Sequence, residues 1–332
     1  MVRISALGAA LALVVAAVAA ALTSSHNASA RPQGSTISLV AYSTPASAYG
    51  QLIPAFQHTP AGSGVSFQQS YGASGEQARA VIAGLKADVV EFSLEPDMTS
   101  LVKAGLIAKS WKKEPFHGIV TRSVVVFVVR KGNPKHIRTW NDLIKPGVGV
   151  LVPNVQTSGG AKWDVMAAYG AQRKLGKSHA QSVSYLDKLY AHVVSQDKSA
   201  REALQTFLAG RGDVLLSYEN DAIFAQQKNQ PVDFVMPKST IQIANPIAVV
   251  KSSSNKPAAR AFVNFLRTKA AQKIWAQNGY RPVLHSAAKG FSFLYPPGVF
   301  SIQWLGGWDK VDKKFFDPNS GIVTKIQKRH GS

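Results

Sequence analysis

Small neutral residues that carry backbone N–H and hydroxyl donors form the most informative stretch of this sequence. Thr157-Ser158-Gly159-Gly160 separates a β-branched apolar run, 148–152, from an amphipathic stretch. A strand, a loop of small residues and a helix start present unpaired N–H groups and the positive end of a helix dipole. Gly residues also let an anion approach the backbone closely. The pattern predicts an anion-binding turn, although an ordinary capped helix start has the same pattern.

The same arrangement recurs at other predicted turns, which are built of Ser, Thr, Gly or Ala with one Pro. The four turns lie at 43–46, 72–75, 157–160 and 199–200, and only the last has flanking cations, Lys198 and Arg201. Ser74 with Gln77 and Ser199 with Glu202 also fit capping boxes, so both Ser residues could serve only as helix caps. A site assembled from these turns would hold an anion mainly through neutral donors.

Hydrophobic periodicity places these turns between strands and helices. Strands are predicted near 35–41, 65–69, 88–92, 122–130, 148–152, 192–195, 213–217, 232–235 and 245–250. Helices are predicted near 46–56, 74–85, 98–104, 160–175, 181–190, 200–208, 221–227, 257–268 and 270–278. Alternating strands and helices favour an α/β fold with parallel sheets. In such sheets ligands bind at the carboxyl ends of the strands, where the four turns are expected.

The first residues have the pattern of a secretory signal peptide. Arg3 precedes an apolar run, 6–22, and Asn27-Ala28-Ser29-Ala30 offers a small-residue cleavage site. We therefore expect a signal peptide at 1–30, with an uncleaved membrane anchor as the alternative. The chain of 332 residues contains no Cys, which excludes disulfides and thiol catalysis. An exported protein of this size without disulfides is typical of a bacterial periplasm.

The composition narrows the possible functions further. The net charge is +20, but the basic residues are spread along the chain and no nucleic-acid-binding motif is evident. The eight His are scattered, so no metal site is expected. There is no G-x-S-x-G elbow and no phosphate-binding G-x-x-x-x-G-K. An oxyanion-binding protein is favoured over two alternatives, an exported hydrolase of phosphate or sulfate esters and a secreted basic adhesin or nucleic-acid binder.

The turns and several other stretches resemble the periplasmic sulfate-binding proteins that serve ABC-type sulfate and thiosulfate importers. The similar stretches, in chain order, are 70–75 with Gln77-Ala78, 129–135, 140–148, 158–163, 212–215, Glu219-Asn220, 280–282 and 306–308. They extend over nearly the whole chain after residue 30, and the run 140–148 is the most specific.

The resemblance implies a two-lobed periplasmic-binding-protein architecture of type II, with the ligand cleft between the lobes. Residues 31–130 and 243–332 would form lobe 1 and residues 131–242 lobe 2, with crossing segments near 130–133 and 244–250. The resemblance also implies a monomer with neither enzymatic activity nor a cofactor. Such a protein delivers sulfate or thiosulfate to a membrane permease.

In the resembling family, sulfate is held by backbone amides, a Ser hydroxyl and a Trp indole. The corresponding donors here are the N–H groups of Ser74, Gly159, Gly160 and Ala200 and the hydroxyl of Ser158. Two ligand positions depart from the family pattern, with Thr44 where the family has Asp and Tyr218 where it has Trp. A phenol O–H is also a donor, although its reach differs from that of an indole. Arg201 is expected to support the site from behind.

Overall fold

The computed structural model describes residues 34–330. The predicted signal peptide, 1–30, lies outside these residues. Within the described range, no helix combines the length and the apolar character that crossing a membrane requires.

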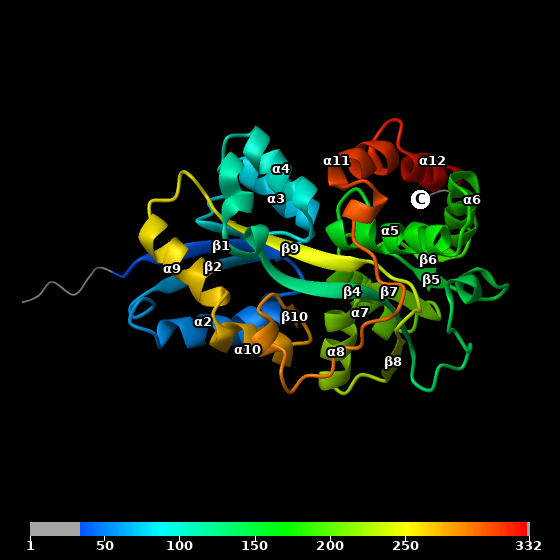
Figure 1. Ribbon diagram of the computed structural model, residues 1–332, viewed down its shortest axis with the longest axis horizontal. Coiled ribbons are helices and arrows are strands. Elements are labelled where there is room, and N and C mark those ends of the chain that lie inside the picture. The colour runs from blue at the N-terminus through cyan, green and yellow to red at the C-terminus, as the bar shows by residue number, and fades with distance from the viewer. Residues whose placement is uncertain (1–33, 331–332) are drawn as a thin grey trace, which may run out of the picture. The chain divides into compact units, whose positions relative to one another are not determined.

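The described residues form a mixed sheet with helices on both faces (Figure 1). The strands are β1 Thr36–Tyr42, β2 Ser66–Gly72, β3 Val89–Glu91, β4 Ile119–Arg130, β5 Val150–Leu151, β6 Val193–Ser195, β7 Val214–Tyr218, β8 Val232–Val235, β9 Gln242–Val249 and β10 Arg281–Pro282. The main path through the sheet is β2-β1-β3-β9-β4-β7-β5-β6, and β8 and β10 both pair with β4.

Strand direction changes in the middle of the sheet. At one end β1 pairs in parallel with β2 and β3, and at the other β5 pairs in parallel with β6 and β7. Between them, β4 and β9 run antiparallel to each other and to their outer neighbours (Figure 1). The predicted parallel pairing is therefore confirmed for the outer strands alone. An apolar run such as β4 signals burial but does not encode strand direction.

The helices match the predicted ones as far as residue 278, whereas the two after it lie where no helix was predicted. They are α2 Ala46–Gln57, α3 Ser74–Ile82, α4 Glu95–Lys103, α5 Gly159–Lys174, α6 His179–Tyr190, α7 Ala200–Leu208, α8 Glu219–Gln227, α9 Lys256–Leu266, α10 Lys269–Gln277, α11 Trp308–Val311 and α12 Ile322–Arg329. Ser199 caps α7 by accepting from the Glu202 N–H at 3.2 Å. The predicted cap at Ser74 is wrong, because Ala73 is the N-cap residue and Ser74 is the first helical residue.

The apolar core divides into clusters on either side of β4 and β9. Two clusters contain the buried faces of α2, α3, α9 and α10, and two others contain those of α5, α6 and α7. The C-terminal residues pack with the second group, where Trp308 meets Trp163 edge-on at 4.7 Å and Phe315 meets Tyr169 at 4.8 Å between ring centroids. The C-terminal residues from 300 to 326 therefore pack with α5 and α6 and not with α9 and α10.

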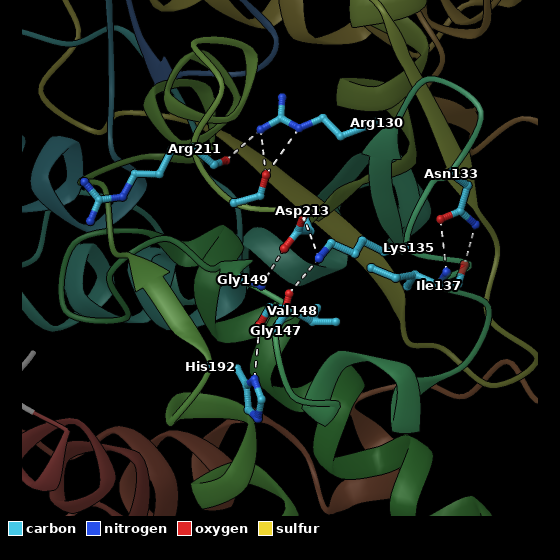
Figure 2. Close-up of polar contacts among 11 residues, drawn as sticks. Arg130, Asn133, Lys135, Ile137, Gly147, Val148, Gly149, His192, Arg211 and Asp213 are labelled. Atoms are coloured by element: carbon cyan, nitrogen blue, oxygen red, sulfur yellow. Dashed lines mark hydrogen bonds and ion pairs between the residues drawn. The ribbon is translucent and has the colours of Figure 1, made fainter.

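A polar cluster joins Arg130, at the end of β4, to the segment just before β7 (Figure 2) and to Phe207 of α7. The Arg130 guanidinium donates to the carbonyls of Phe207, Arg211 and Gly212 at 2.6 to 3.2 Å. It also stacks on the Phe207 ring at 3.8 Å. The Asp213 carboxylate accepts from the Gly149 N–H at 2.8 Å. Two stretches that resemble the sulfate-binding proteins, 129–135 and 212–215, thus have a structural role at this corner.

Candidate anion-binding site

The predicted turns meet at one small pocket, whose empty space is about 220 Å³ including the part open to solvent. Its lining residues are Tyr42, Ser43, Thr44, Ala73, Ser74, Ser93, Ser158, Gly159, Gly160, Ser199, Ala200 and Tyr218. Every residue expected to contact the ligand belongs to this set, and Arg201 lies just outside it. The structure therefore brings together residues that are more than 170 positions apart in the chain.

Helix starts supply most of the potential donors. Four helices begin at the pocket wall, α3 at Ser74, α5 at Gly159, α7 at Ala200 and α8 directly after Tyr218. The first N–H groups of a helix have no partner within that helix. Each macrodipole also favours an anion near its N-terminus by about 0.3–1 kcal/mol, and by up to about 2 kcal/mol where the site is partly buried. The converging helices create a positive potential without a charged side chain.

Ser158 is the N-cap residue of α5 and is buried. Its hydroxyl oxygen accepts from the Ala161 N–H at 3.3 Å. Because that bond uses a lone pair of the oxygen, the hydroxyl proton remains available for a ligand in the pocket. The residue can therefore cap the helix and donate to an anion at the same time.

The Ser74 hydroxyl is already engaged within the protein. It donates to Asp97 Oδ2 at 2.5 Å and accepts from the Ser93 N–H at 2.9 Å. Only the backbone N–H of Ser74 is thus available to a ligand, which agrees with the amide contact that the resemblance implies. These two bonds also tie the start of α3 to α4 and to the segment just before it.

Tyr218 and Ser93 face each other in the pocket wall. Their hydroxyl oxygens lie 2.6 Å apart, and both residues are almost fully buried. Ser93 was not among the predicted site residues. A signal was present, since it directly follows the predicted strand 88–92, but no Gly or helix cap marks the position. Tyr42, at the end of β1, was also missed, and its buried hydroxyl forms no hydrogen bond of normal geometry within the described residues.

Thr44 and Arg201 connect opposite sides of the pocket. The Arg201 guanidinium donates to the Thr44 carbonyl at 2.9 Å, lies 3.5 Å from Asp221 Oδ1 and stacks over the Phe224 ring at 4.0 Å. The Thr44 hydroxyl lies 3.2 Å from that of Tyr280. Arg201 thus holds one wall of the pocket without lining it.

The two glycines of α5 occupy different surroundings. A Cβ on Gly159 would lie 2.2 Å from Leu94 Cδ2, so this position permits close packing of α5 against the segment after β3. A Cβ on Gly160 would lie 3.3 Å from Ser158 Oγ and 3.7 Å from a Tyr218 ring carbon, which are pocket atoms. Gly160 therefore keeps space open for a ligand, while Gly159 allows the wall to form.

Charged side chains are excluded from the pocket lining, but carboxyl groups lie behind it. Burial raises the pKa of Asp164 well above its usual range, and the nearby Asp221 raises it further. Burial also raises the pKa of Glu91 to about 8, opposed by the hydrogen bond from the Tyr49 hydroxyl. The lining offers no His, Lys, Asp or Glu as a base beside Ser158. That donor set can hold an oxyanion but lacks the partner that an activated Ser nucleophile requires.

The sequence profile of the bacterial extracellular solute-binding proteins matches residues 37–281. The chain belongs to this family. It is 40% identical to the sulfate-binding protein of Synechococcus elongatus, over 97% of this chain and 95% of that protein. It is 33% identical to the thiosulfate-binding protein of Pseudomonas aeruginosa, over 86% and 90%.

A solved structure is also similar along most of the chain. The sulfate-binding protein SubI of Mycobacterium tuberculosis is 45% identical, with a TM-score of 0.83, and the match covers 85% of this chain and 100% of SubI. The type II periplasmic-binding-protein architecture and the resemblance to the sulfate-binding proteins are thereby confirmed. These relatives are named for binding an anion and not for catalysis, in agreement with the expectation that the chain is not an enzyme.

Proposed function

We propose that this protein binds sulfate outside the cytoplasm and delivers it to an ABC-type importer. The observation that carries the proposal is the pocket itself, in which four helix starts and the Ser158 hydroxyl converge while no charged side chain lines the wall. The names of the relatives support sulfate as the ligand, and thiosulfate is the close alternative.

The donor set suits a fully deprotonated dianion. Sulfate carries no proton at neutral pH, so each of its oxygens can accept from the N–H and O–H groups of the wall. Ser158 contributes a hydroxyl, and Ser74, Gly159, Gly160 and Ala200 contribute backbone N–H groups at helix starts. We assign Thr44 and Tyr218 to the remaining wall and Arg201 to its support. The bond from Arg201 to the Thr44 carbonyl keeps the cation near the anion without direct contact.

The proposed delivery cycle requires two lobes that close on the ligand. We place lobe 1 at 34–130 and 243–299 and lobe 2 at 131–242, and we assign residues 300–326 to lobe 2 because they pack in its core. Contacts across the pocket support a closed arrangement, since the Gly75 N–H donates to the Thr157 carbonyl at 2.9 Å. Sulfate should compact the protein in small-angle scattering, and unchanged dimensions would contradict closure.

Calorimetric titration of the chain from residue 31 onward tests the ligand assignment. Sulfate, thiosulfate, phosphate and molybdate are compared at low and high sodium chloride. We expect one sulfate per chain and an affinity that survives high salt, because a buried site is screened far less than a surface charge. Weak binding that disappears with salt would mean that the net charge of +20 simply attracts anions.

The transport part of the proposal has a separate test. Sulfate-loaded protein should stimulate ATP hydrolysis by its importer in proteoliposomes, and at a sulfate concentration near the wild-type Kd a Ser158→Ala variant should stimulate it much less. We also propose a periplasmic location after cleavage of residues 1–30, a monomeric protein and no role in nucleic-acid binding. N-terminal sequencing of exported protein should begin at Arg31, and light scattering should give the mass of one chain.

A further inference from the structure

A second polar feature lies away from the pocket, in a groove between the 3-10 helix Lys109–Lys113, the end of β9 and α9. The groove has about 1050 Å³ of empty space and is open to solvent. Its apolar wall includes Trp111, Ile247 and Val263, all of them buried. It shares no residue with the oxyanion pocket.

Arg267, which follows α9, lines this groove, and its side chain is only 4% exposed. Its Nε, Nη1 and Nη2 atoms all lack a hydrogen-bond partner among the described residues. The nearest opposite charge is Glu114 Oε2, 3.8 Å from Nη1, which is too long for a hydrogen bond. A buried guanidinium with unpaired donors is destabilising unless a partner is supplied. Within the described residues, the Arg267 guanidinium therefore keeps hydrogen-bond donors that the protein itself does not pair.

The surrounding charges favour a negatively charged ligand. Lys251, Lys256 and Arg260 also line the groove and are exposed at its rim, whereas Glu114 is the single acidic lining residue. The Glu114 side chain is 59% exposed, so it can turn into solvent with little loss of packing. Burial lowers the pKa of Arg267 and the Glu114 charge opposes that shift, as expected for a cation that lacks sufficient partners.

We propose that this groove is a second anion-binding site, which takes a small organic carboxylate on Arg267 in place of Glu114. A carboxylate matches the planar fork of a guanidinium with two parallel hydrogen bonds. The apolar wall formed by Trp111, Ile247 and Val263 accommodates the carbon body of such a ligand, which inorganic sulfate lacks. The rim cations increase the local concentration of any anion.

Benzoate and its uncharged counterpart benzamide are suitable probes. They are titrated separately into ¹⁵N-labelled, sulfate-saturated protein, and the backbone resonances of 247–251 and the Arg267 Nε–H resonance are followed. We expect benzoate to shift both sets saturably, and benzamide to leave the Nε–H resonance unchanged. Equal shifts with both probes, or benzoate shifts spread over exposed Lys residues elsewhere, would overturn the proposal.

Variants of the competing carboxylate provide the decisive comparison. Glu114→Gln should bind benzoate about fivefold more tightly, the effect of removing a unit charge about 4 Å away in a water-like dielectric. Asp309→Asn removes an exposed carboxylate outside the groove and should leave benzoate affinity unchanged. Arg260→Gln should weaken benzoate binding, and none of the three variants should alter sulfate affinity. If Glu114→Gln and Asp309→Asn bind benzoate with the same affinity, Arg267 is not the group that binds it.

Discussion

The hydroxyl oxygens of Tyr218 and Ser93 lie 2.6 Å apart and join the end of β7 to the segment after β3 across the pocket wall. If Ser93 donates, the phenol proton is free to reach a bound anion. The phenol can then donate a hydrogen bond to the anion of the proposed site. Since burial raises the pKa of Tyr218 well above its usual value, it keeps this proton at neutral pH.

Tyr218→Phe should therefore weaken sulfate binding by about 1.5–3 kcal/mol, the cost of losing a hydrogen bond to a charged group. The matched control is Tyr190→Phe, which removes a buried hydroxyl outside the pocket that has no partner in the described structure. Calorimetric titration should show reduced affinity for the first variant alone. Equal affinities for Tyr218→Phe and the wild type would remove Tyr218 from the ligand contacts.

Ser158→Ala should also weaken sulfate binding by about 1.5–3 kcal/mol, because the anion loses the single side-chain donor of the α5 turn. The change additionally removes a helix cap, at about 1 kcal/mol of folding stability. Ser178→Ala separates the two effects, since Ser178 caps α6 and does not line the pocket. Both variants should unfold more readily, but Ser178→Ala should retain full affinity. If both variants lost affinity, the stability of a helix cap, and not a hydrogen bond from the Ser158 hydroxyl to sulfate, would determine the binding.

Ala substitution should affect the two glycines of α5 differently. Gly159→Ala forces its Cβ against Leu94, so we expect a loss of about 1–3 kcal/mol in stability, the usual range for overpacking. Gly160→Ala places its Cβ 3.3 Å from Ser158 Oγ, which should reduce sulfate affinity with little change in melting temperature. Thermal unfolding without ligand, combined with titration, distinguishes the two. The reverse pattern would place the ligand on the other side of the turn.

The sequence was sufficient to locate the turns that line the pocket because their signal is local. A strand, small residues and a helix start lie within a few positions at Ser158, and the chain periodicity places the other turns at the same edge. Ser74 shows the limit of this reasoning. Its capping pattern is local, but its hydroxyl bonds to Asp97 and Ser93, which are distant in sequence and close only after folding.

Other features depend entirely on tertiary packing. Gly159 and Gly160 look alike in the sequence, and only their folded neighbours distinguish them, Leu94 for Gly159 and Tyr218 for Gly160. The antiparallel course of β4 and β9 is likewise not encoded in their apolar composition. Arg267 appeared in the sequence as one cation among many, and its significance lies in burial without hydrogen-bond partners.

The buried carboxyl of Glu91 should make folding stability depend on pH. Its pKa is raised to about 8 by burial, so the protonated form is favoured in the folded state. Its contribution is fully present below the unfolded pKa, near 4.5, and is lost as pH rises toward 8. Relative to Glu91→Gln, the wild type should lose up to about 1.4 kcal/mol per pH unit in this window.

Denaturant unfolding of both proteins at pH 5 and pH 8 measures this difference. Glu202→Gln, which removes an exposed carboxyl, serves as the control, and its stability difference from the wild type should be the same at both pH values. A constant difference between wild type and Glu91→Gln would show that Glu91 is ionised in the folded protein at pH 5.

Anion choice follows from the absence of a carboxylate in the pocket lining. Phosphate carries at least one O–H at neutral pH, and leaving it buried without an acceptor costs about 1–3 kcal/mol. The acidic residues that lie near the turns in sequence, Glu76, Asp197 and Glu219, do not line the pocket, and Glu219 instead pairs with Arg281 at 2.7 Å. We therefore expect sulfate to be preferred over phosphate by at least about tenfold, the lower end of that cost.

Competition titrations at pH 6 and pH 8 test this preference. Sulfate affinity should be nearly the same at both, because sulfate remains a dianion throughout. Thr44 is the residue to examine if the result differs, since its hydroxyl lies 3.2 Å from Tyr280 and can accept as well as donate. Phosphate binding as tight as that of sulfate at pH 6, lost in Thr44→Val, would show that this hydroxyl accepts the phosphate proton and would end the assignment of sulfate as the preferred ligand.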